Sequence, residues 1–205
     1  MADEVTLWRT GRKKLAADPV FGPLVSAVGP VRATMSEEPP FVYLARSIIY
    51  QQLAGAAAQT IHGRFVKALK GEVTPEKVLR VRETTLRKAG LSGAKARAVR
   101  DLATKIRSGE VEVHDLADLP DEDVIDRLTR VWGIGTWTVQ MYLMFRLHRP
   151  DVWPEGDLGV RQGFAKLHGH DPAPTQKEMG PLGEPYRPWR SAAAWYCWRA
   201  LEIEL

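Results

Sequence analysis

Apolar residues recur three and four positions apart along almost the whole chain, and this helical period limits the folds open to it. The segment 41–49 carries one apolar stripe, formed by Phe41, Leu44, Ala45, Ile48 and Ile49. The same spacing marks the segments 61–69, 94–106 and 124–132. The segment 139–147 is apolar nearly all round and predicts a central, buried helix, and a last helix is expected at about 188–204. The best strand candidate, residues 110–113, is too short to build a sheet. The sequence therefore predicts an all-α protein.

The single cysteine and the lack of long apolar runs exclude several classes of protein. Cys197 is the one cysteine of 205 residues, so the chain forms no internal disulfide and no four-cysteine metal or iron–sulfur site. No apolar run approaches the roughly 18 residues of a membrane-spanning helix. The acidic start, residues 1–4, leads into no signal-peptide core. We expect an intracellular, soluble protein with no membrane partner.

The charge balance is weakly informative. Lysine and arginine outnumber aspartate and glutamate by 29 to 25, which gives a net charge of +4. A positive balance suits a nucleic-acid partner, but many basic proteins bind no nucleic acid.

Two glycines separate two apolar helical segments in the sharpest local motif of the chain. Residues 128–138 read Leu-Thr-Arg-Val-Trp-Gly-Ile-Gly-Thr-Trp-Thr, and we expect a helix that ends at Trp132, a tight turn, and a new helix from about Thr136. The backbone N–H groups at the start of the second helix form an anion site. The pattern indicates a helix-hairpin-helix motif, which binds the DNA backbone without reading sequence. A plain helix–turn–helix connection with a glycine cap remains an alternative.

An aspartate at the start of a helix follows this motif after one further helix. Asp157 ends a loop rich in proline and glycine and opens a helix in which Val160, Phe164 and Leu167 point inward. Out of context, an aspartate in this position is most simply an N-cap.

Together, a hairpin, a crossing helix and a loop ending in Gly-Asp resemble the helix-hairpin-helix (HhH-GPD) base-excision DNA glycosylases. Segments 50–58, 89–96 and 188–198 look like the 3-methyladenine DNA glycosylase II branch, and the resemblance covers residues 41–205. The bacterial prototype also carries an N-terminal α/β domain, for which the short segment before Phe41 leaves no room. We therefore expect a short form that lacks that domain.

The resemblance implies two helical subdomains with the active-site cleft between them. Residues 1–40 would supply N-terminal helices that join the second subdomain. Residues 41–150 would form a helical domain that ends in the hairpin motif, at about 121–148. Residues 151–205 would supply the catalytic loop and the C-terminal helices.

In this family the aspartate that matches Asp157 is the essential catalytic carboxylate. It would stabilise the cationic sugar and orient or deprotonate water, and a helix N-terminus favours its negative charge. Members that also cut the DNA strand carry a lysine nucleophile at the position of Trp137. The resemblance therefore implies a monofunctional glycosylase that uses water, requires no cofactor and acts on a base flipped out of the duplex.

An N-alkylated purine is cationic, and aromatic faces attract cations by about 0.5–2 kcal/mol per contact. Trp137 and Trp198 match the aromatic pocket positions of the family, whereas Met141 and Leu158 stand where it has further aromatics. For both tryptophans, ordinary core packing remains an alternative.

The remaining family positions concern DNA contacts. Gln52 matches the wedge residue that fills the gap left by the flipped base. Two alternatives stay open: Gln52 is a helix-end residue without a role, or its neighbours Tyr50 and Gln51 share the role of wedge. The expected contacts to the DNA backbone come from Gly133, Gly135, Thr136, Thr138 and Lys95. For Lys95, a solvated charged face is the alternative. The resemblance also implies a structural Na⁺ or K⁺ ion held by the backbone carbonyls of Thr129, Val131 and Ile134.

The resemblance favours a monomeric DNA repair enzyme that removes alkylated bases from double-stranded DNA. Its preferred base stays open among 3-methyladenine, 7-methylguanine, 1-methyladenine, ethenoadenine and hypoxanthine. Two rivals remain: a helix-hairpin-helix protein that binds DNA without chemistry, and a glycosylase for oxidised or mismatched bases. Release of free base separates the first rival from the enzyme.

Overall fold

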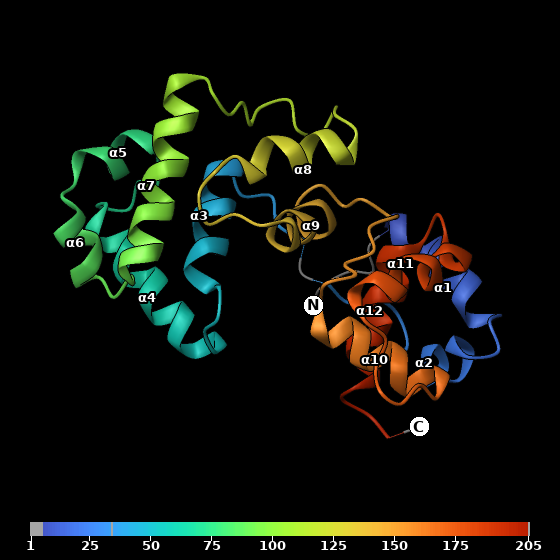
Figure 1. Cartoon of the computed structure of the whole chain (residues 1–205). Coiled ribbons are helices and arrows are strands. Elements are labelled where there is room, and N and C mark those ends of the chain that lie inside the picture. Colours follow the sequence, from blue (N-terminus) through green and yellow to red (C-terminus); the bar gives the residue numbers. More distant parts are fainter. Residues whose placement is uncertain (1–5, 34, 205) are drawn as a thin grey trace. The chain divides into compact units, whose positions relative to one another are not determined.

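The computed structural model describes residues 6–33 and 35–204, and within these ranges it is helical and contains no strand. The predicted all-α class is therefore confirmed. The acidic start, residues 1–4, lies outside the described residues. In chain order (Figure 1) the helices are α1 (Thr6–Ala16), α2 (Phe21–Val28), α3 (Pro40–Tyr50), α4 (Gly55–Ala68), α5 (Pro75–Arg80), α6 (Glu83–Lys88), α7 (Gly93–Ser108), α8 (Asp121–Thr129), α9 (Thr136–Phe145), α10 (Leu158–His168), α11 (Gln176–Gly183), the 3-10 turn η1 (Glu184–Tyr186) and α12 (Arg190–Ala200).

The chain forms two compact units. The first combines residues 1–35 with 143–205, and the second consists of residues 36–142. The first unit therefore contains α1, α2, α10, α11 and α12, and the second contains α3 to α8 with most of α9. The observed boundaries fall after Met35 and Tyr142, whereas the sequence led us to expect divisions after residues 40 and 150.

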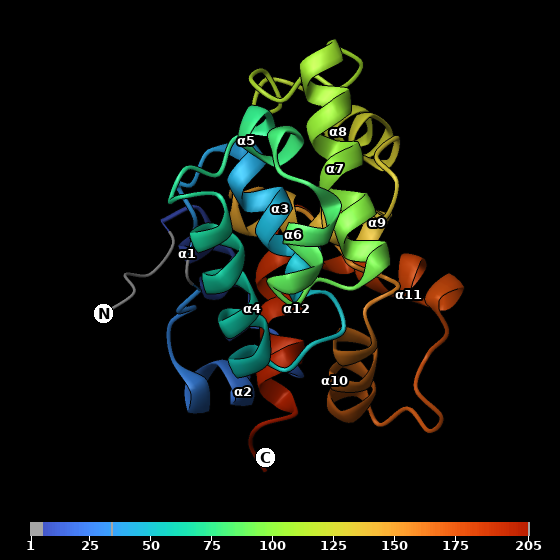
Figure 2. The same cartoon turned by 90° about the vertical axis from the view of Figure 1, so that its left-hand side faces the viewer.

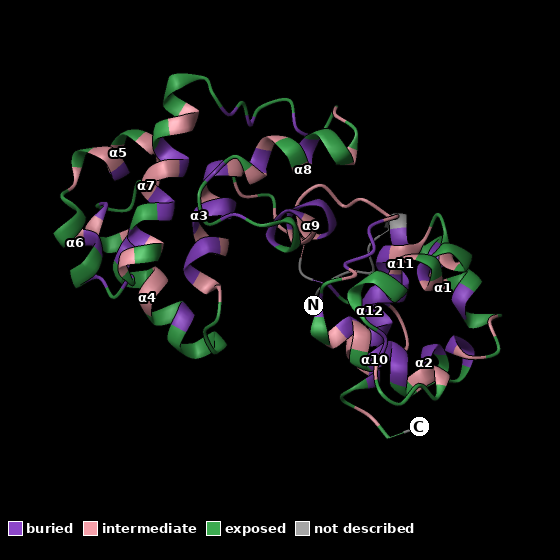
Figure 3. Cartoon of the chain, viewed as in Figure 1, coloured by how far each residue is buried: buried purple, intermediate pink, exposed green. Residues whose placement is uncertain are grey.

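Helix α7 is the centre of the second unit. It contacts α3, α5 and α6 (Figure 2), because one of its faces carries small and branched apolar residues that are buried against these helices. The side chain of Ser92 caps its N-terminus by accepting a hydrogen bond from the N–H of Lys95, and Gly109 ends it in the left-handed conformation. Its buried residues are Ala96, Ala98, Val99, Leu102 and Ala103. Figure 3 shows this buried face beside an exposed one.

Helix α12 is the centre of the first unit, and residues 191–197 are buried along it (Figure 3). It contacts α1, α2 and α10. A Cβ at Gly163 of α10 would lie 1.9 Å from the carbonyl oxygen of Cys197, so the two helix backbones touch at this point. Only glycine permits such an approach.

Several helix boundaries confirm the sequence analysis. The stripe at 41–49 lies on α3 and the segment 94–106 lies on α7. Thr74 caps α5 by accepting the N–H of Lys77, with Pro75 as the first helical residue.

Two expectations about helix ends were wrong. Helix α8 ends at Thr129 and not at Trp132, because the carboxylate of Asp101 on α7 accepts the N–H of Trp132 at 2.7 Å. The last helix spans Arg190–Ala200, which is shorter than the expected 188–204.

The stretch 170–187, although rich in proline and glycine, contains α11 and η1. Thr175 and Glu178 form a reciprocal capping box that starts α11. The box was visible in the sequence, but Pro181 and the glycines of this segment concealed the helix behind it.

None of the helices in the described ranges combines the length and the apolar character needed to cross a membrane.

Candidate active site and nucleic-acid interface

The hairpin lies between α8 and α9 and is shaped by two glycines. Gly133 has a φ of +85°, a region that residues with a side chain rarely adopt. A Cβ at Gly133 would also lie 2.9 Å from the Cβ of Ala98 on α7. At Gly135, by contrast, a Cβ would meet no atom within 4 Å. The first glycine therefore serves the packing of the turn against α7, and the second leaves the backbone open to an approaching group.

Helix α7 holds the hairpin by hydrogen bonds from two further side chains. Asp101 accepts the N–H of Trp132, and the Nζ of Lys105 donates to the carbonyl oxygen of Arg130 at 2.8 Å. Lys105 is itself paired with Glu110 at 2.7 Å. The exposed residues Gly135 and Thr136 then begin α9, where the first helical N–H groups lack intrahelical partners. This fixed helix start has the chemistry of an anion site.

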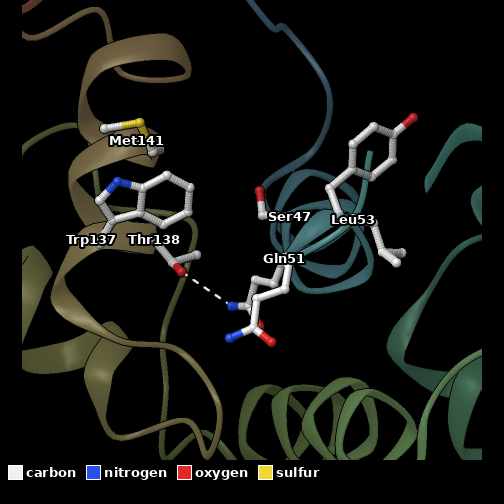
Figure 4. A pocket seen from close by; sticks show the side chains of 8 residues that line it. Ser47, Gln51, Leu53, Trp137, Thr138 and Met141 are labelled. Atoms are coloured by element: carbon white, nitrogen blue, oxygen red, sulfur yellow. Dashed lines mark hydrogen bonds between the residues drawn. The ribbon is translucent and has the colours of Figure 1, made fainter. Parts of the chain in front are cut away.

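A pocket of about 440 Å³ opens beside the hairpin, between the end of α3 and one side of α9. Trp137 and Met141 line it from α9 and face Ser47, Gln51 and Leu53 (Figure 4). Trp137 is 45% exposed, so much of its indole is available to a ligand. The lining residues are Ser47, Tyr50, Gln51, Gln52, Leu53, Trp137, Thr138 and Met141. The structure thus brings four predicted site residues, Gln52, Trp137, Thr138 and Met141, to one pocket.

The sequence analysis did not identify Ser47 and Leu53 as lining residues. Ser47 and Tyr50 are three positions apart on α3, which places them on one side of the helix, and Gln51 follows as its C-cap. For Ser47, a polar side chain on an otherwise apolar helix was the signal in the sequence, whereas Leu53, which lies beyond the helix, has no comparable signal.

The segment after α3 has an unusual backbone. Gln52 has a φ of +54°, a left-handed conformation that costs a residue with a side chain roughly 1–2 kcal/mol. The preceding residue is fixed by its side chain, because the Nε2 of Gln51 donates to the carbonyl oxygen of Gly133 at 3.0 Å and to Oγ1 of Thr138 at 3.2 Å. The end of α3 is therefore tied to the hairpin.

The ammonium of Lys95 lies against the same segment. Its Nζ donates to the carbonyl oxygens of Ile49 and Gln51, both at 2.7 Å. Burial lowers the pKa of Lys95 below its usual value. The phosphate contact expected of this residue stays a prediction.

Asp157 is the N-cap of α10 and is 9% exposed. Its Oδ1 accepts hydrogen bonds from the N–H of Val160 at 2.8 Å and from the indole Nε1 of Trp198 at 2.9 Å. A Cβ at Gly159 would lie 2.8 Å from Cδ1 of Trp198. Glycine at this position therefore makes room for the indole that orients the carboxylate.

Two other predicted or reactive side chains lie in this unit. Leu158, the first residue of α10, is 60% exposed. Burial, followed by the negative charge of Asp157, raises the pKa of the Cys197 thiol. Because the thiolate is the nucleophilic form, Cys197 is a neutral core side chain and not a nucleophile.

The loop that leads to Asp157 is anchored by residues that the sequence did not single out. Arg190 binds the carboxylate of Asp151 through Nε to Oδ1 at 2.7 Å and Nη2 to Oδ2 at 3.0 Å, and its Nη2 also donates to the carbonyl oxygen of Asp151 at 3.0 Å. The buried hydroxyl of Ser191 donates to the carbonyl of Arg149 at 2.7 Å and accepts the N–H of Val152 at 3.0 Å. The bidentate pair of Arg190 and Asp151 fixes the orientation of the two side chains as well as their distance.

The predicted site residues are divided between the two units. Asp157, Leu158 and Trp198 belong to the first unit. The hairpin, the pocket, Gln52 and Lys95 belong to the second. Among the described residues, no group of three or more histidine, cysteine, aspartate or glutamate side chains is arranged to hold a metal ion.

The chain is similar to known proteins over most of its length. Residues 45–188 match the model of the HhH-GPD superfamily base excision DNA repair proteins. The chain is 36% identical over 186 residues to DNA-3-methyladenine glycosylase 1 of Schizosaccharomyces pombe. The alignment covers 88% of this chain and 81% of that protein.

Two solved structures are similar as well. The S. pombe 3-methyladenine DNA glycosylase in complex with abasic DNA has a TM-score of 0.86 at 34% identity, covering 95% of this chain and 97% of that one. A DNA-3-methyladenine glycosidase from Bacillus halodurans has a TM-score of 0.82 at 32% identity, covering 93% and 88%.

Proposed function

Because the chain belongs to the HhH-GPD superfamily of base excision DNA repair proteins, we propose that it is a monofunctional DNA glycosylase. Its substrate is a flipped-out alkylated base, such as 3-methyladenine or 7-methylguanine, in double-stranded DNA. The observation that carries this proposal is the carboxylate of Asp157, held by Trp198 and Val160 at the start of α10. The names of the relatives support the substrate class.

The base would occupy the pocket beside α9. The exposed face of Trp137 offers an electron-rich surface to a cationic ring, and Met141 adds a polarizable contact. Alkylation at purine N3 or N7 already makes the base a good leaving group, so little acid catalysis is required.

Asp157 would act on the sugar and on water. As the C1′–N bond breaks, its electron pair leaves with the base, and the carboxylate stabilises the positive charge on the sugar. Water then bonds to C1′ and Asp157 accepts its proton. Trp137 stands where a strand-cutting member has a lysine, so the product is an abasic site in an intact strand. Trp198 orients Asp157, and Leu158 is the exposed neighbour available to the DNA.

The hairpin would hold the DNA backbone. Gly133 and Gly135 shape the turn, and the N–H groups around Thr136 and Thr138 bind a phosphate. Gln52 would fill the gap left by the flipped base. We expect the protein to act as a monomer on DNA in the cytoplasm, associated with the nucleoid.

The hairpin carbonyls have the chemistry of an alkali-metal site. Thr129 ends α8, where helical carbonyls lack intrahelical partners. The oxygen of Val131 accepts the N–H of Ile134 at 3.1 Å and keeps a second lone pair. With the carbonyl of Ile134, these oxygens would hold Na⁺ or K⁺ against a phosphate. Replacement of K⁺ by a tetraalkylammonium ion at constant ionic strength should weaken DNA binding.

Chromatography of the material released from a methylated duplex tests the proposed function. We expect free 3-methyladenine and 7-methylguanine, with strand breaks that appear only after alkali. Binding without release from a panel that also contains 1-methyladenine, ethenoadenine and hypoxanthine would favour the non-catalytic alternative. Release of oxidised or mismatched bases alone would favour the other rival.

A further inference from the structure

We propose that Lys95 is a positioning residue for the wedge segment, residues 51–54, and acts by holding the end of α3 instead of a DNA phosphate. This inference rests on the proposed function, because it assigns Lys95 a part in base flipping. It differs from the expectation from sequence, in which Lys95 contacts the DNA backbone.

The first observation concerns the hydrogen-bond donors to the carbonyl groups at the end of α3. A helix leaves its final carbonyls without intrahelical partners. Here the N–H of Leu53 bonds the carbonyl of Tyr50 at 3.3 Å, and the ammonium of Lys95 bonds those of Ile49 and Gln51 at 2.7 Å each. Lys95 therefore completes the end of a helix other than its own.

The second observation is that this cap continues into the hairpin. Gln51 receives the ammonium at its carbonyl oxygen and donates from its Nε2 to Gly133 and Thr138. Helix α7, the end of α3 and the hairpin are thus joined by one chain of hydrogen bonds, drawn in part in Figure 4. The residue at the junction, Gln51, directly precedes Gln52.

The third observation is the backbone of Gln52. Its φ of +54° is sparsely populated for glutamine and persists only where the surroundings over-determine it. The contacts of Lys95 and Gln51 hold the backbone on the N-terminal side of Gln52. Without Lys95, Gln52 would relax toward an ordinary conformation and its exposed side chain would point elsewhere.

A phosphate contact and a positioning role predict different responses to salt. Each phosphate neutralised contributes about −0.9 to the slope of log K against log salt concentration. A positioning residue changes base flipping and leaves that slope unchanged. Lys95→Met keeps the length of the side chain and removes its donors and charge. Lys67→Met, on the exposed face of α4, is the charge-matched control.

The experiment uses a duplex with an abasic-site analogue opposite 2-aminopurine, whose fluorescence reports insertion of the wedge and requires no catalysis. We expect Lys95→Met to reduce the fluorescence change roughly tenfold with an unaltered salt slope. Gln52→Ala should produce a similar loss, and the double variant should lose no more than either single variant.

A smaller salt slope for Lys95→Met with native fluorescence, or losses that add in the double variant, would overturn the proposal. Equal melting temperatures of Lys95→Met and the native chain exclude loss of folding as the cause. If Lys95→Met is less stable, Lys95→Gln, which keeps a donor, serves as the test variant. Because the readout needs no base release, failure of the proposed enzyme activity and failure of this inference remain distinguishable.

Discussion

The indole Nε1 of Trp198 donates a hydrogen bond of 2.9 Å to Oδ1 of Asp157. The same oxygen accepts the N–H of Val160 at 2.8 Å, so it is held from two directions. The residues lie 41 positions apart in the sequence and are brought together by the packing of α10 on α12. Trp198 therefore orients the proposed catalytic carboxylate, in addition to any contact that its ring makes with a base.

Trp198→Phe tests this role. The variant keeps an aromatic ring and removes the donor, so base release should slow by about tenfold to a hundredfold, the loss expected for one hydrogen bond to a charged group. Single-turnover release kinetics measure the effect. Trp195→Phe, on the same helix, is the matched control and should retain the native rate. Native kinetics for Trp198→Phe would show that the indole does not position Asp157.

Gly159→Ala should disturb the same contact by steric means. Its Cβ would lie 2.8 Å from Trp198, so the indole must shift at a cost of about 1–3 kcal/mol in unfolding free energy. Gly63→Ala, where a Cβ meets nothing within 4 Å in the middle of α4, should instead add about 0.5–1 kcal/mol. Denaturant melts of both variants check the pair, and equal stability changes would contradict the packing described for Gly159.

Substitutions at the two hairpin glycines should affect different properties, protein stability at Gly133 and DNA binding at Gly135. Gly133→Ala places a Cβ 2.9 Å from Ala98 at positive φ and should cost about 2 kcal/mol of stability. Gly135→Ala meets no neighbour, so its stability should match the native chain while a methyl group at the phosphate approach weakens DNA binding about tenfold. Thermal melts and titrations with duplex DNA measure the two effects. Native affinity in Gly135→Ala would argue against backbone contact at this turn.

Stability should fall in mild acid. Burial, together with the charge of His170, lowers the pKa of His168 below its usual value of 6.5, although Asp18 acts in the opposite sense. The unfolded chain therefore binds more protons below pH 6.5, and the contribution of this histidine is lost as the pH falls toward its folded pKa. Burial lowers the pKa of His62 as well, with the same sign.

Melting temperatures measured from about pH 7 down to about pH 5 check this dependence. His168→Gln should flatten the profile, since it removes a histidine with a lowered pKa. If His168→Gln keeps the native dependence of melting temperature on pH, His168 does not cause the loss of stability in acid.

The parts of the fold that sequence predicted well are those set by local periodicity and capping. The amphipathic stripes of α3 and α7 are properties of residues close together in the sequence. Asp157 was expected to open a helix, and it caps α10. The end of α8 was predicted wrongly because the N–H of Trp132 is accepted by the carboxylate of Asp101, which belongs to another helix.

Long-range contacts explain what the sequence could not predict about the candidate site. The bond from Gln51 to Gly133 joins residues 82 positions apart, and the ammonium of Lys95 lies on carbonyls of a different helix. Neither contact has a local signature, because each depends on how α3, α7 and the hairpin pack. The positive φ of Gln52 likewise follows from those contacts and not from its residue type.

Base release by Asp157→Asn tests the central claim most directly. Asparagine is also a strong N-cap, so the variant should keep α10 and the fold while it loses the negative charge. The native chain should release 3-methyladenine and 7-methylguanine from a methylated duplex. The variant should bind abasic DNA with native affinity and release base at least a hundredfold more slowly, in the range of about 10²–10⁴ for a general base. Release by Asp157→Asn at the native rate would contradict the assignment of Asp157 as the catalytic carboxylate.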